Sequence, residues 1–218
     1  MYRKKFLLIA IFITTSVALG IIALASGKGE SSADVALGEA RRLKQLDENS
    51  AEVRVTLPMF RRLNESYMRG SVPLSGSIEV LKRLGVKSLV DLRSAYDHTV
   101  SIGKAALTEG LQYFWLPMSV WNAPSDEQAN EFISLVTDES RGPFYVFCTD
   151  GLNRTGEMSA IYRLMRDKWD IEQSLKEMDE IGFNPYYYTL RNYVWTYARK
   201  FRPQAVPRQA RRLSSFEK

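Results

Sequence analysis

The residues best suited to catalysis lie in one short run, residues 148–156, with the sequence CTDGLNRTG. Cys148 is the only cysteine of the 218 residues, and Arg154 follows it six positions later. A cysteine acts as a nucleophile in its thiolate form, and a nearby guanidinium group favours that form. The same guanidinium fork matches two oxygens of a phosphate group. The run therefore predicts a loop that binds a phosphate and places a sulfur nucleophile beneath it.

The residues that follow Cys148 are predicted to form the phosphate-binding loop. Their backbone N–H groups can converge on an anion, as they do in other anion-binding turns. Gly151 allows the backbone to turn tightly, and Thr155 can donate a hydrogen bond to the sulfur as it leaves. The predicted phosphate-binding residues are Thr149, Asp150, Gly151, Leu152, Asn153 and Arg154.

Two elements must hold this loop in place. Residues 144–147 (FYVF) follow Gly142-Pro143 and are too few for a buried helix, so they predict a central strand. A helix is expected from about Thr155 to Lys168. A cysteine between the end of a strand and the start of a helix faces the positive end of the helix dipole, which also favours the thiolate.

The rest of the chain alternates predicted strands with predicted helices. Short apolar runs predict strands at residues 54–57, 86–92 and 113–116. Helical spacing of apolar residues predicts helices at 34–49, 77–84, 126–136, 171–181 and 186–201. This order predicts an α/β fold in three layers, with a mostly parallel central sheet flanked by helices and preceded by an N-terminal apolar helix.

At residues 148–156 the chain resembles the C-x5-R cysteine phosphatase superfamily, and within it the bacterial dual-specificity-type (tyrosine) protein phosphatases. The resemblance extends over about residues 55–200 and includes the segments 60–73, 84–94, 116–132 and 158–183. It implies the three-layer fold of that superfamily and a two-step hydrolysis of phosphomonoesters that needs no metal. By position, Cys148 would be the nucleophile, and Arg154 would bind the phosphate and stabilise the transition state.

Three positions depart from the pattern of that family. Phe147 stands where the family usually has a histidine, so a hydrogen bond that orders the loop is missing. Asn153 replaces an aspartate that is frequent in bacterial relatives. Glu157 replaces a neutral residue, and its negative charge is expected to weaken the positive field at the start of the helix. These departures keep a second interpretation open, a phosphate-binding protein with weak or no turnover.

A general acid must protonate the leaving group, and the sequence offers several carboxylates. Asp126, which follows the predicted strand 113–116, is the first candidate. Its alternative role is structural, because Pro124-Ser125-Asp126 is also an ordinary helix start. Asp150 within the loop is the second candidate, and Asp97 with His98 is the third.

The substrate is less well defined than the chemistry. The resemblance favours phosphotyrosine or mixed phosphoprotein substrates. The loop contains no lysine, which argues against highly anionic inositol phosphates, yet its first residues, CTDG, are similar to those of myotubularin-type phosphoinositide phosphatases. A phosphorylated protein and a phospholipid therefore both stay open as substrates. Sulfur transfer of the rhodanese type is a third possibility, which the Arg-Thr-Gly ending of the loop disfavours.

The N-terminal residues predict a membrane segment. Residues 6–25 are uninterrupted apolar or small residues behind a basic start, and as a helix they would span roughly 30 Å, the hydrocarbon thickness of a bilayer. They are expected to anchor the chain, or to be cleaved as a signal peptide after Ala25. In both cases the catalytic domain is expected outside the cytoplasm, either membrane-anchored or secreted or periplasmic. The predicted parts are 1–25 anchor or signal, 26–50 linker and surface helix, 51–202 phosphatase domain and 203–218 basic disordered tail.

Composition excludes several classes of partner. One cysteine and one histidine leave no set of ligands for a zinc site and no intramolecular disulfide, so no cofactor or metal is expected. The formal net charge of +5 comes from the two ends of the chain, and the residues between them carry an acidic excess. Nucleic acid is therefore not an expected partner.

Overall fold

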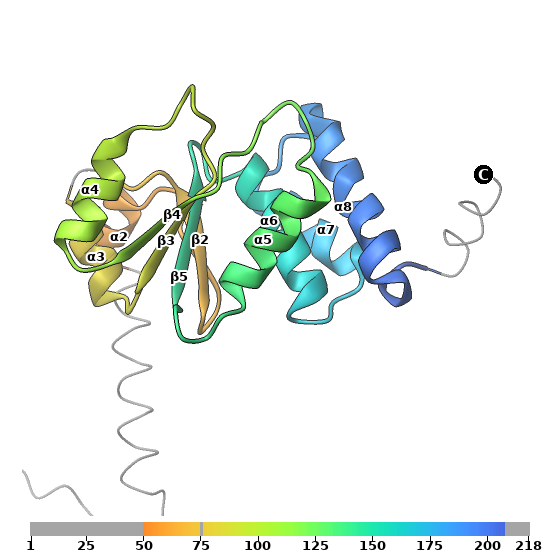
Figure 1. Ribbon diagram of the computed structural model, residues 1–218, viewed down its shortest axis with the longest axis horizontal. Coiled ribbons are helices and arrows are strands. Elements are labelled where there is room, and N and C mark those ends of the chain that lie inside the picture. Colours follow the sequence, from red (N-terminus) through yellow and green to blue (C-terminus); the bar gives the residue numbers. More distant parts are fainter. Residues whose placement is uncertain (1–49, 75, 208–218) are drawn as a thin grey trace, which may run out of the picture. The chain divides into compact units, whose positions relative to one another are not determined.

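The computed structural model describes residues 50–74 and 76–207. These residues form an α/β domain around a five-stranded sheet (Figure 1). The predicted anchor, the linker with its helix at 34–49 and most of the predicted tail lie outside the described residues.

The sheet has the strand order β1-β2-β5-β3-β4. Its strands are β1 (Arg61–Asn64), β2 (Tyr67–Ser71), β3 (Ser88–Asp91), β4 (Gln112–Trp115) and β5 (Phe144–Cys148). β5 lies in the middle of the sheet, as its short apolar sequence predicts, and runs parallel to both β2 and β3. β4 is also parallel to β3, whereas β1 pairs with β2 in the antiparallel direction. The sheet is therefore mixed, with its parallel part at the centre.

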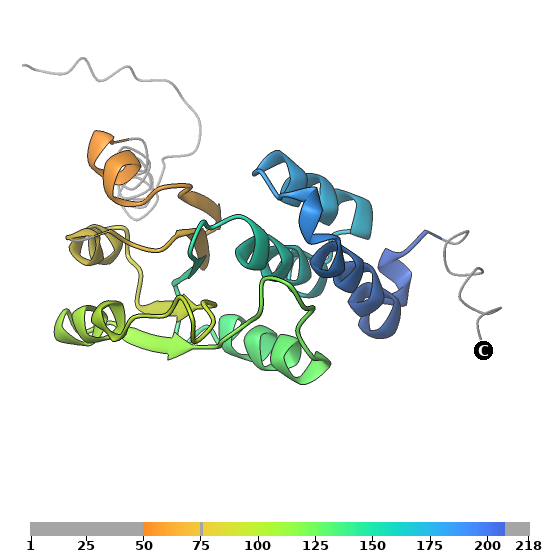
Figure 2. The ribbon, with the colours of Figure 1, turned by 90° about the horizontal axis from the view of Figure 1, so that it is seen from above.

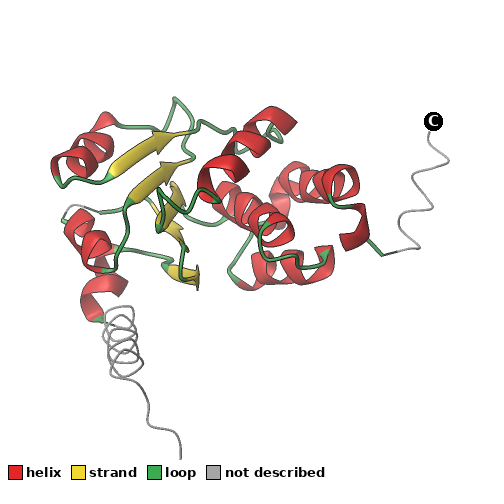
Figure 3. Cartoon of the chain, turned by 60° about the horizontal axis from the view of Figure 1, so that its bottom comes forward, coloured by secondary structure: helices red, strands yellow, loops and turns green. Residues whose placement is uncertain are grey.

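Helices cover both faces of this sheet (Figures 1 and 2). On one side lie α2 (Ala51–Thr56), α3 (Ser77–Arg83) and α4 (Val100–Thr108). On the other side lie α5 (Asp126–Val136) and α6 (Asn153–Met165), and α7 (Ile171–Glu180) and α8 (Tyr188–Phe201) pack against α6. Short 3-10 turns are η1 (Pro185–Tyr187) and η2 (Pro203–Ala205). Figure 3 shows the strands between the two groups of helices.

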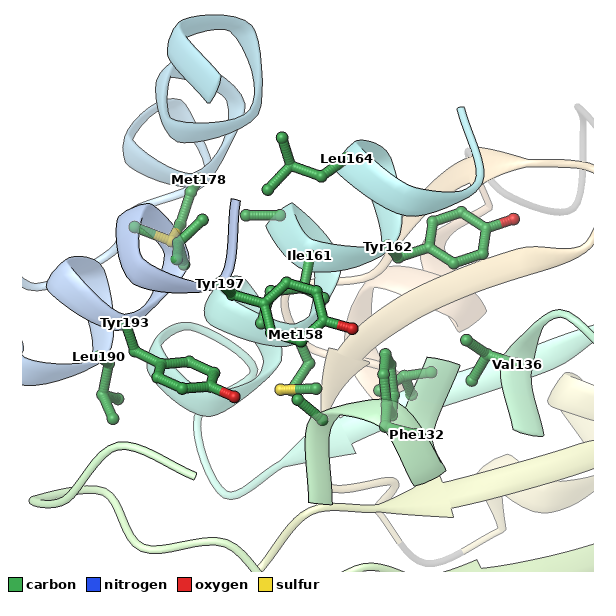
Figure 4. Packing of buried hydrophobic residues seen from close by; sticks show 14 of the residues in the cluster. Phe132, Val136, Met158, Ile161, Tyr162, Leu164, Met178, Leu190, Tyr193 and Tyr197 are labelled. Atoms are coloured by element: carbon green, nitrogen blue, oxygen red, sulfur yellow. The ribbon is translucent and has the colours of Figure 1, made fainter. Parts of the chain in front are cut away.

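The two faces of the sheet have separate apolar cores. Because side chains alternate along a strand, Phe144 and Val146 of β5 join the core beneath α5–α8, while Tyr145 and Phe147 join the core beneath α2–α4. α6 is buried along almost its whole length, from Asn153 to Leu164. Figure 4 shows its side chains packed between those of α5, α7 and α8. The helix that follows the cysteine loop is thus fixed from several sides.

One predicted strand and one predicted domain boundary differ in the structure. The segment 54–57, predicted as a strand, belongs to helix α2, because the Ser50 side chain caps its first turn and Val53 and Leu57 bury one face four residues apart. The domain also continues past the predicted boundary at Arg202. Ala205 and Val206 are buried, and Arg202 donates to the Leu164 and Lys168 carbonyl groups.

The predicted location outside the cytoplasm needs a correction. Within residues 50–74 and 76–207, no helix combines the length and the apolar character needed to cross a membrane. The apolar segment 6–25, on which the prediction rested, lies outside the described residues. The structure therefore gives no support to the predicted membrane segment or to the location that was predicted from it.

Candidate active site

Cys148 is the last residue of β5, and the loop after it leads directly into α6. The cysteine is 2% exposed. α6 has Leu152 at its N-cap and, like α3, α4 and α8, has no side-chain cap, whereas α5 and α7 each begin with a complete capping box. The first N–H groups of a helix have no acceptor within the helix. At α6 no side-chain cap occupies them, so they are available to an anion beside the cysteine.

Gly151 forms the tight turn of the loop. Its φ of +70° lies in the left-handed region, and a Cβ atom there would be 2.3 Å from the backbone carbon of Gly70. The loop therefore passes so close to the end of β2 that only glycine fits. On the other side, Val72 N donates to Thr149 O at 3.3 Å, which holds the loop against the same segment.

Arg154, in the first turn of α6, is buried and paired with Asp97. Its Nη2 lies 2.8 Å from Asp97 Oδ2, and Thr149 Oγ1 donates to the same carboxylate oxygen. Ser94 Oγ also donates to Asp97, at 2.6 Å. Burial raises the pKa of Asp97, but the hydrogen bonds from Arg154, Ser94 and Thr149 outweigh it and hold the pKa well below its ordinary value. A carboxylate of the chain itself thus occupies two donors of the predicted phosphate site.

A cavity of about 610 Å³ opens beside this ion pair. Its wall comes from two loops, residues 94–97 after β3 and residues 117–122 after β4, together with Arg154. Arg154 is the only basic residue among those that line it, and the exposed ring of Trp121 lies at its edge. Trp121 contacts the ring of Tyr187, with 5.3 Å between centroids, so η1 supports this edge. Within the part of the chain that the structure describes, no group of three His, Cys, Asp or Glu side chains could hold a metal ion.

Phe147, which replaces the expected histidine, lies in the core on the opposite face of the sheet from Cys148. Its ring stacks on Tyr145, and the Arg93 guanidinium lies 5.5 Å from its centroid. Arg93 is held by Asp91 at 2.6 Å and donates to the Asp97 carbonyl at 3.3 Å. Asp91 therefore has a structural role at the end of β3, and through Arg93 it supports the segment that carries Asp97.

Glu157 does not act as the sequence predicts. Its carboxyl group is completely buried in the second turn of α6 and has no hydrogen-bond partner among the described residues. Burial raises the pKa of Glu157 well above its ordinary value and so favours the neutral form of the carboxyl group. The negative charge that was expected to weaken the field at the start of α6 is therefore disfavoured.

Asp126 and Asn153 have partners away from the cysteine. Asp126, the first candidate for the general acid, accepts from Tyr193 Oη at 2.9 Å and pairs with Lys200. Lys200, followed by Tyr193, lowers the pKa of Asp126. Asn153 Oδ1 accepts from Asn184 N at 2.9 Å and ties α6 to η1. The structure thus brings Thr149, Arg154 and Asp97 together, and it places Asp126 in a contact with α8.

His98 and Asp150 complete the set of predicted residues. His98 Nε2 lies 2.9 Å from Tyr113 Oη and its ring stacks on Trp115, so its contacts are with β4. The side chain of Asp150 is exposed on the loop. Thr155 is buried, and its hydroxyl group has no hydrogen-bond partner among the described residues.

The sequence interpretation missed Arg69, which lies beneath the loop. This residue of β2 is 1% exposed, and its Nη2 donates to Gly151 O at 2.6 Å. The signal available in the sequence was the place of Arg69 in the segment 60–73, which carries part of the family resemblance. No sequence rule links such a residue to a loop 82 positions away.

Comparison with known families gives a match over most of the described domain. The model of the family described as "DSP-PTPase phosphatase fused to NAD+ Kinase" matches residues 56–188. The dual specificity protein phosphatase TpbA of Pseudomonas aeruginosa is 30% identical over 122 residues, which cover 56% of this chain and 54% of TpbA. A probable chloroplastic NAD kinase 2 of Oryza sativa subsp. japonica is 31% identical over 106 residues, 44% of this chain and 10% of that protein. The chain thus spans about half the length of TpbA and about a tenth of the length of the NAD kinase.

Solved structures give the same fold. The crystal structure of P. aeruginosa TpbA superposes with a TM-score of 0.55 at 25% identity, covering 63% of this chain and 84% of TpbA. The core catalytic domain of the S. cerevisiae PP-IP phosphatase SIW14 superposes with a TM-score of 0.57 at 16% identity, covering 74% of this chain and 93% of that domain. At that identity the second likeness concerns the fold alone.

Proposed function

The chain belongs to the family of DSP-PTPase phosphatases fused to NAD+ kinase, and from this premise we propose that it hydrolyses phosphomonoesters through a phospho-cysteine at Cys148. The proposal requires no metal ion. It assigns Cys148 as nucleophile, Arg154 and the N–H groups of residues 149–153 as the phosphate-binding groups, and Thr155 as the donor to the sulfur.

The observation that carries the proposal is the uncapped start of α6 beside a buried cysteine. Two sources of positive potential meet there: the open N–H groups of the helix, which form the positive end of its dipole, and the Arg154 guanidinium. None of the turn and loop hydrogen bonds of the described residues uses the backbone N–H of Thr149, Asp150 or Gly151. Arg154 Nε is buried and also has no partner within those residues. These donors suit the three oxygens of a phosphoryl group.

The reaction proceeds in two displacements. The Cys148 thiolate attacks phosphorus while the bond between phosphorus and the leaving oxygen breaks, and that oxygen takes a proton from a carboxylic acid. Water then attacks the phospho-cysteine, the bond between phosphorus and sulfur breaks, and the water proton passes to the carboxylate. The buried Thr155 hydroxyl donates to the departing thiolate. Cys148 and the acid thereby return to their first states.

Two carboxylates compete for the role of acid. Asp126 stays the prediction from the sequence, and Asp97 is the carboxylate that contacts Arg154. A bound phosphoryl group would take Arg154 from Asp97. The loss of that hydrogen bond removes the largest stabilisation of the ionised carboxylate, so protonation of Asp97 becomes easier when substrate is bound. This contact favours Asp97.

The wall of the cavity supports substrates with one phosphate and an apolar or aromatic body. A single basic residue lines it, and its other side chains include Met118, Val120 and Trp121. A ligand with several phosphates would leave most of its charge without a cation. Phosphotyrosine in a protein meets this description, and a solved structure of P. aeruginosa TpbA contains pTyr. A structure of PTPMT1 contains PI(5)P, and its likeness to this chain, 15% identity, concerns the fold alone.

The test is the hydrolysis of p-nitrophenyl phosphate by the purified chain in the presence of a metal chelator. We expect turnover by the wild type, and losses of at least about 10³-fold in Cys148→Ser and about 10²-fold in Arg154→Ala. Arg166→Ala is the control, because Arg166 is an exposed residue at the opposite end of α6, where it pairs with Glu139. A folded wild type that binds phosphate without turnover would contradict the proposal and support a binding protein. Phosphotyrosine peptides and phosphoinositide vesicles then separate the two substrate classes.

The acid is tested with two leaving groups. Without a proton donor, a poor leaving group such as phenolate departs slowly, whereas p-nitrophenolate departs almost as well as before. We expect Asp97→Asn to lose about tenfold or more with phenyl phosphate and less with p-nitrophenyl phosphate. Asp126→Asn is the matched variant. If Asp126→Asn shows this selective loss and Asp97→Asn does not, the acid is Asp126.

A further inference from the structure

Arg69 is a buried cation without an ionic partner. It is 1% exposed, and no carboxylate pairs with it among the described residues. Among the described residues, its side chain makes one hydrogen bond, from Nη2 to Gly151 O at 2.6 Å, and its Nε and Nη1 atoms are buried without a partner there. A buried charge that lacks a partner is costly, so an arginine at this position needs a compensating anion or a function.

The strand register places Arg69 on the same face of the sheet as Cys148. β2 and β5 are parallel, with Arg69 opposite Val146 and Ser71 opposite Cys148. Tyr67, two residues before Arg69, faces α6 and contacts Ser159 and Tyr162. Because side chains alternate along a strand, Arg69 extends on this face as well, between the sheet and the start of α6.

Few groups can supply the missing negative charge. Burial lowers the pKa of Arg69, and Tyr67, Cys148, Glu177 and Tyr145 oppose this effect. Burial raises the pKa values of Tyr67 and Tyr145 far above the ordinary value, so both hydroxyl groups are neutral. Glu177 is already paired with Arg163 at 2.6 Å. Cys148 is therefore the remaining group whose ionisation would compensate the charge of Arg69.

The hydrogen bond of Arg69 also orients the loop. A peptide unit is planar, and its C=O and N–H groups point in opposite directions. Because the Gly151 carbonyl points toward Arg69, the Leu152 N–H of the same peptide points away from it. This orientation is the one that the phosphate-binding loop requires, and the Phe147 ring cannot provide it because it lies in the other core.

We propose that Arg69 is a positioning residue of the phosphatase reaction: it fixes the Gly151 carbonyl and serves as the buried counter-ion of the Cys148 thiolate. Arg69 thereby takes over the ordering of the loop at a site where Phe147 stands in place of the usual histidine. This inference rests on the proposed function for its catalytic part, whereas the pairing of charges concerns the resting protein.

The experiment measures alkylation of Cys148 by iodoacetamide as a function of pH in the full chain. Cys148 is the only cysteine, so the reaction reports on this site alone. In Arg69→Met we expect the pH midpoint of alkylation to rise by about 1, which lowers the rate several-fold to tenfold on the acid side of the midpoint. Arg69→Lys retains the charge and is expected to keep the midpoint, while its rate of p-nitrophenyl phosphate hydrolysis falls because one ammonium group holds the carbonyl less firmly.

Arg202→Met is the matched control. Arg202 is also buried and also donates to backbone carbonyl groups, but at the far end of α6, near Leu164 and Lys168. We expect it to leave the midpoint of alkylation unchanged. Circular dichroism and a thermal transition show which variants are folded, and Arg69→Lys keeps the test decisive if Arg69→Met does not fold.

The outcomes separate this inference from the proposed function. An unchanged midpoint in folded Arg69→Met, or equal rises in Arg69→Met and Arg69→Lys, overturns the role as counter-ion. Full hydrolysis by both variants overturns the role in positioning. If the midpoint shifts as expected but the wild type hydrolyses no phosphomonoester, the pairing of Arg69 with the thiolate stands and the proposed function fails.

Discussion

Some ionisable side chains of α6 are buried in unusual electrostatic surroundings. Glu157 is the clearest case, because its carboxyl group is fully buried without a partner among the described residues. When folding raises the pKa of a carboxylic acid, the free energy of unfolding is highest at low pH, where the group is protonated in both states. It decreases at higher pH, where only the folded state holds the proton. This contribution is complete below about pH 4.3, the ordinary value for glutamate, and is lost as the pH rises toward the pKa of the folded state.

We therefore expect Glu157→Gln to stabilise the protein at neutral pH. The difference in the free energy of unfolding between the variant and the wild type should grow by up to about 1.4 kcal/mol per pH unit above pH 4.3, because only the wild type binds a proton on folding. Urea denaturation at a series of pH values measures it. A difference that does not change with pH would mean that the Glu157 carboxyl group is ionised in the folded protein.

Gly151 is a second residue with a specific requirement. Gly151→Ala combines a left-handed backbone with a Cβ atom 2.3 Å from Gly70 C, so we expect a loss of stability above about 3 kcal/mol and a loss of activity. Gly110→Ala has a similar φ of +78° but no atom within 4 Å, and should cost only about 1 kcal/mol. Chemical denaturation measures the loss in free energy of unfolding for each variant. Equal losses would show that the close contact with β2 is unimportant.

At the scale of elements, one residue at the start of α5, Gln128, takes part in the helix cap and also contacts the wall of the cavity. Gln128 and Gln173 have the same place in the capping boxes of α5 and α7. Gln128 Nε2 additionally donates to Pro117 O at 3.0 Å, and Pro117 lines the cavity. The two glutamines therefore form a natural pair for comparison.

We expect Gln128→Ala and Gln173→Ala to lower the free energy of unfolding by a similar amount, about 0.5–1 kcal/mol, because each removes half of a capping box. Only Gln128→Ala should raise KM for an aryl phosphate, since it also releases the loop that carries Met118 and Trp121. Denaturation curves and steady-state kinetics test both statements. An equal KM in the two variants would indicate that the Pro117 contact does not hold the wall.

Elements with strong local signals could be predicted from the sequence. The central strand β5, the loop 148–154 and the helix α6 follow from an apolar run, a glycine and the residues after it, and the structure confirms these elements. The segment 54–57 was predicted as a strand, because Arg54 and Thr56 alternate with Val55 and Leu57, but most of it belongs to α2, whose cap at Ser50 was not weighed. The pairing of Asp97 with Arg154, and of Arg69 with Gly151, joins residues 57 and 82 positions apart, and such contacts depend on the register of the sheet.

At the scale of the whole domain, the residues after α8 close the core beneath α6. Ala205 and Val206 are buried, although they lie in the segment predicted as a disordered tail. We expect a chain that ends at Arg202 to lose about 1–2 kcal/mol relative to one that ends at Pro207, the value for burial of one valine and one alanine side chain. The thermal midpoints of the two chains measure this difference, and equal midpoints would contradict a structural role for η2.

The single thiol also determines the response of the molecule to oxidants. A sulfenic acid at Cys148 has no second cysteine in this sequence with which to form a disulfide. We expect peroxide to inactivate the protein, reversibly by thiol at low dose and irreversibly at high dose as sulfinic acid forms. Mass spectrometry of Cys148 alongside residual activity tests this course. Full activity after prolonged exposure, with Cys148 unmodified, would count against a reactive thiolate.

Arg154 pairs with Asp97, a carboxylate of its own chain, so an anion that binds Arg154 must displace this carboxylate. In the proposed reaction, Asp97 would displace from Arg154 the phosphate that turnover frees. Competition from Asp97 is expected to lower the affinity of the site for phosphate and to speed the release of this product. Orthophosphate should therefore bind Asp97→Asn about tenfold more tightly than the wild type, as measured by calorimetry, and the wild-type enzyme should resist inhibition by its own product.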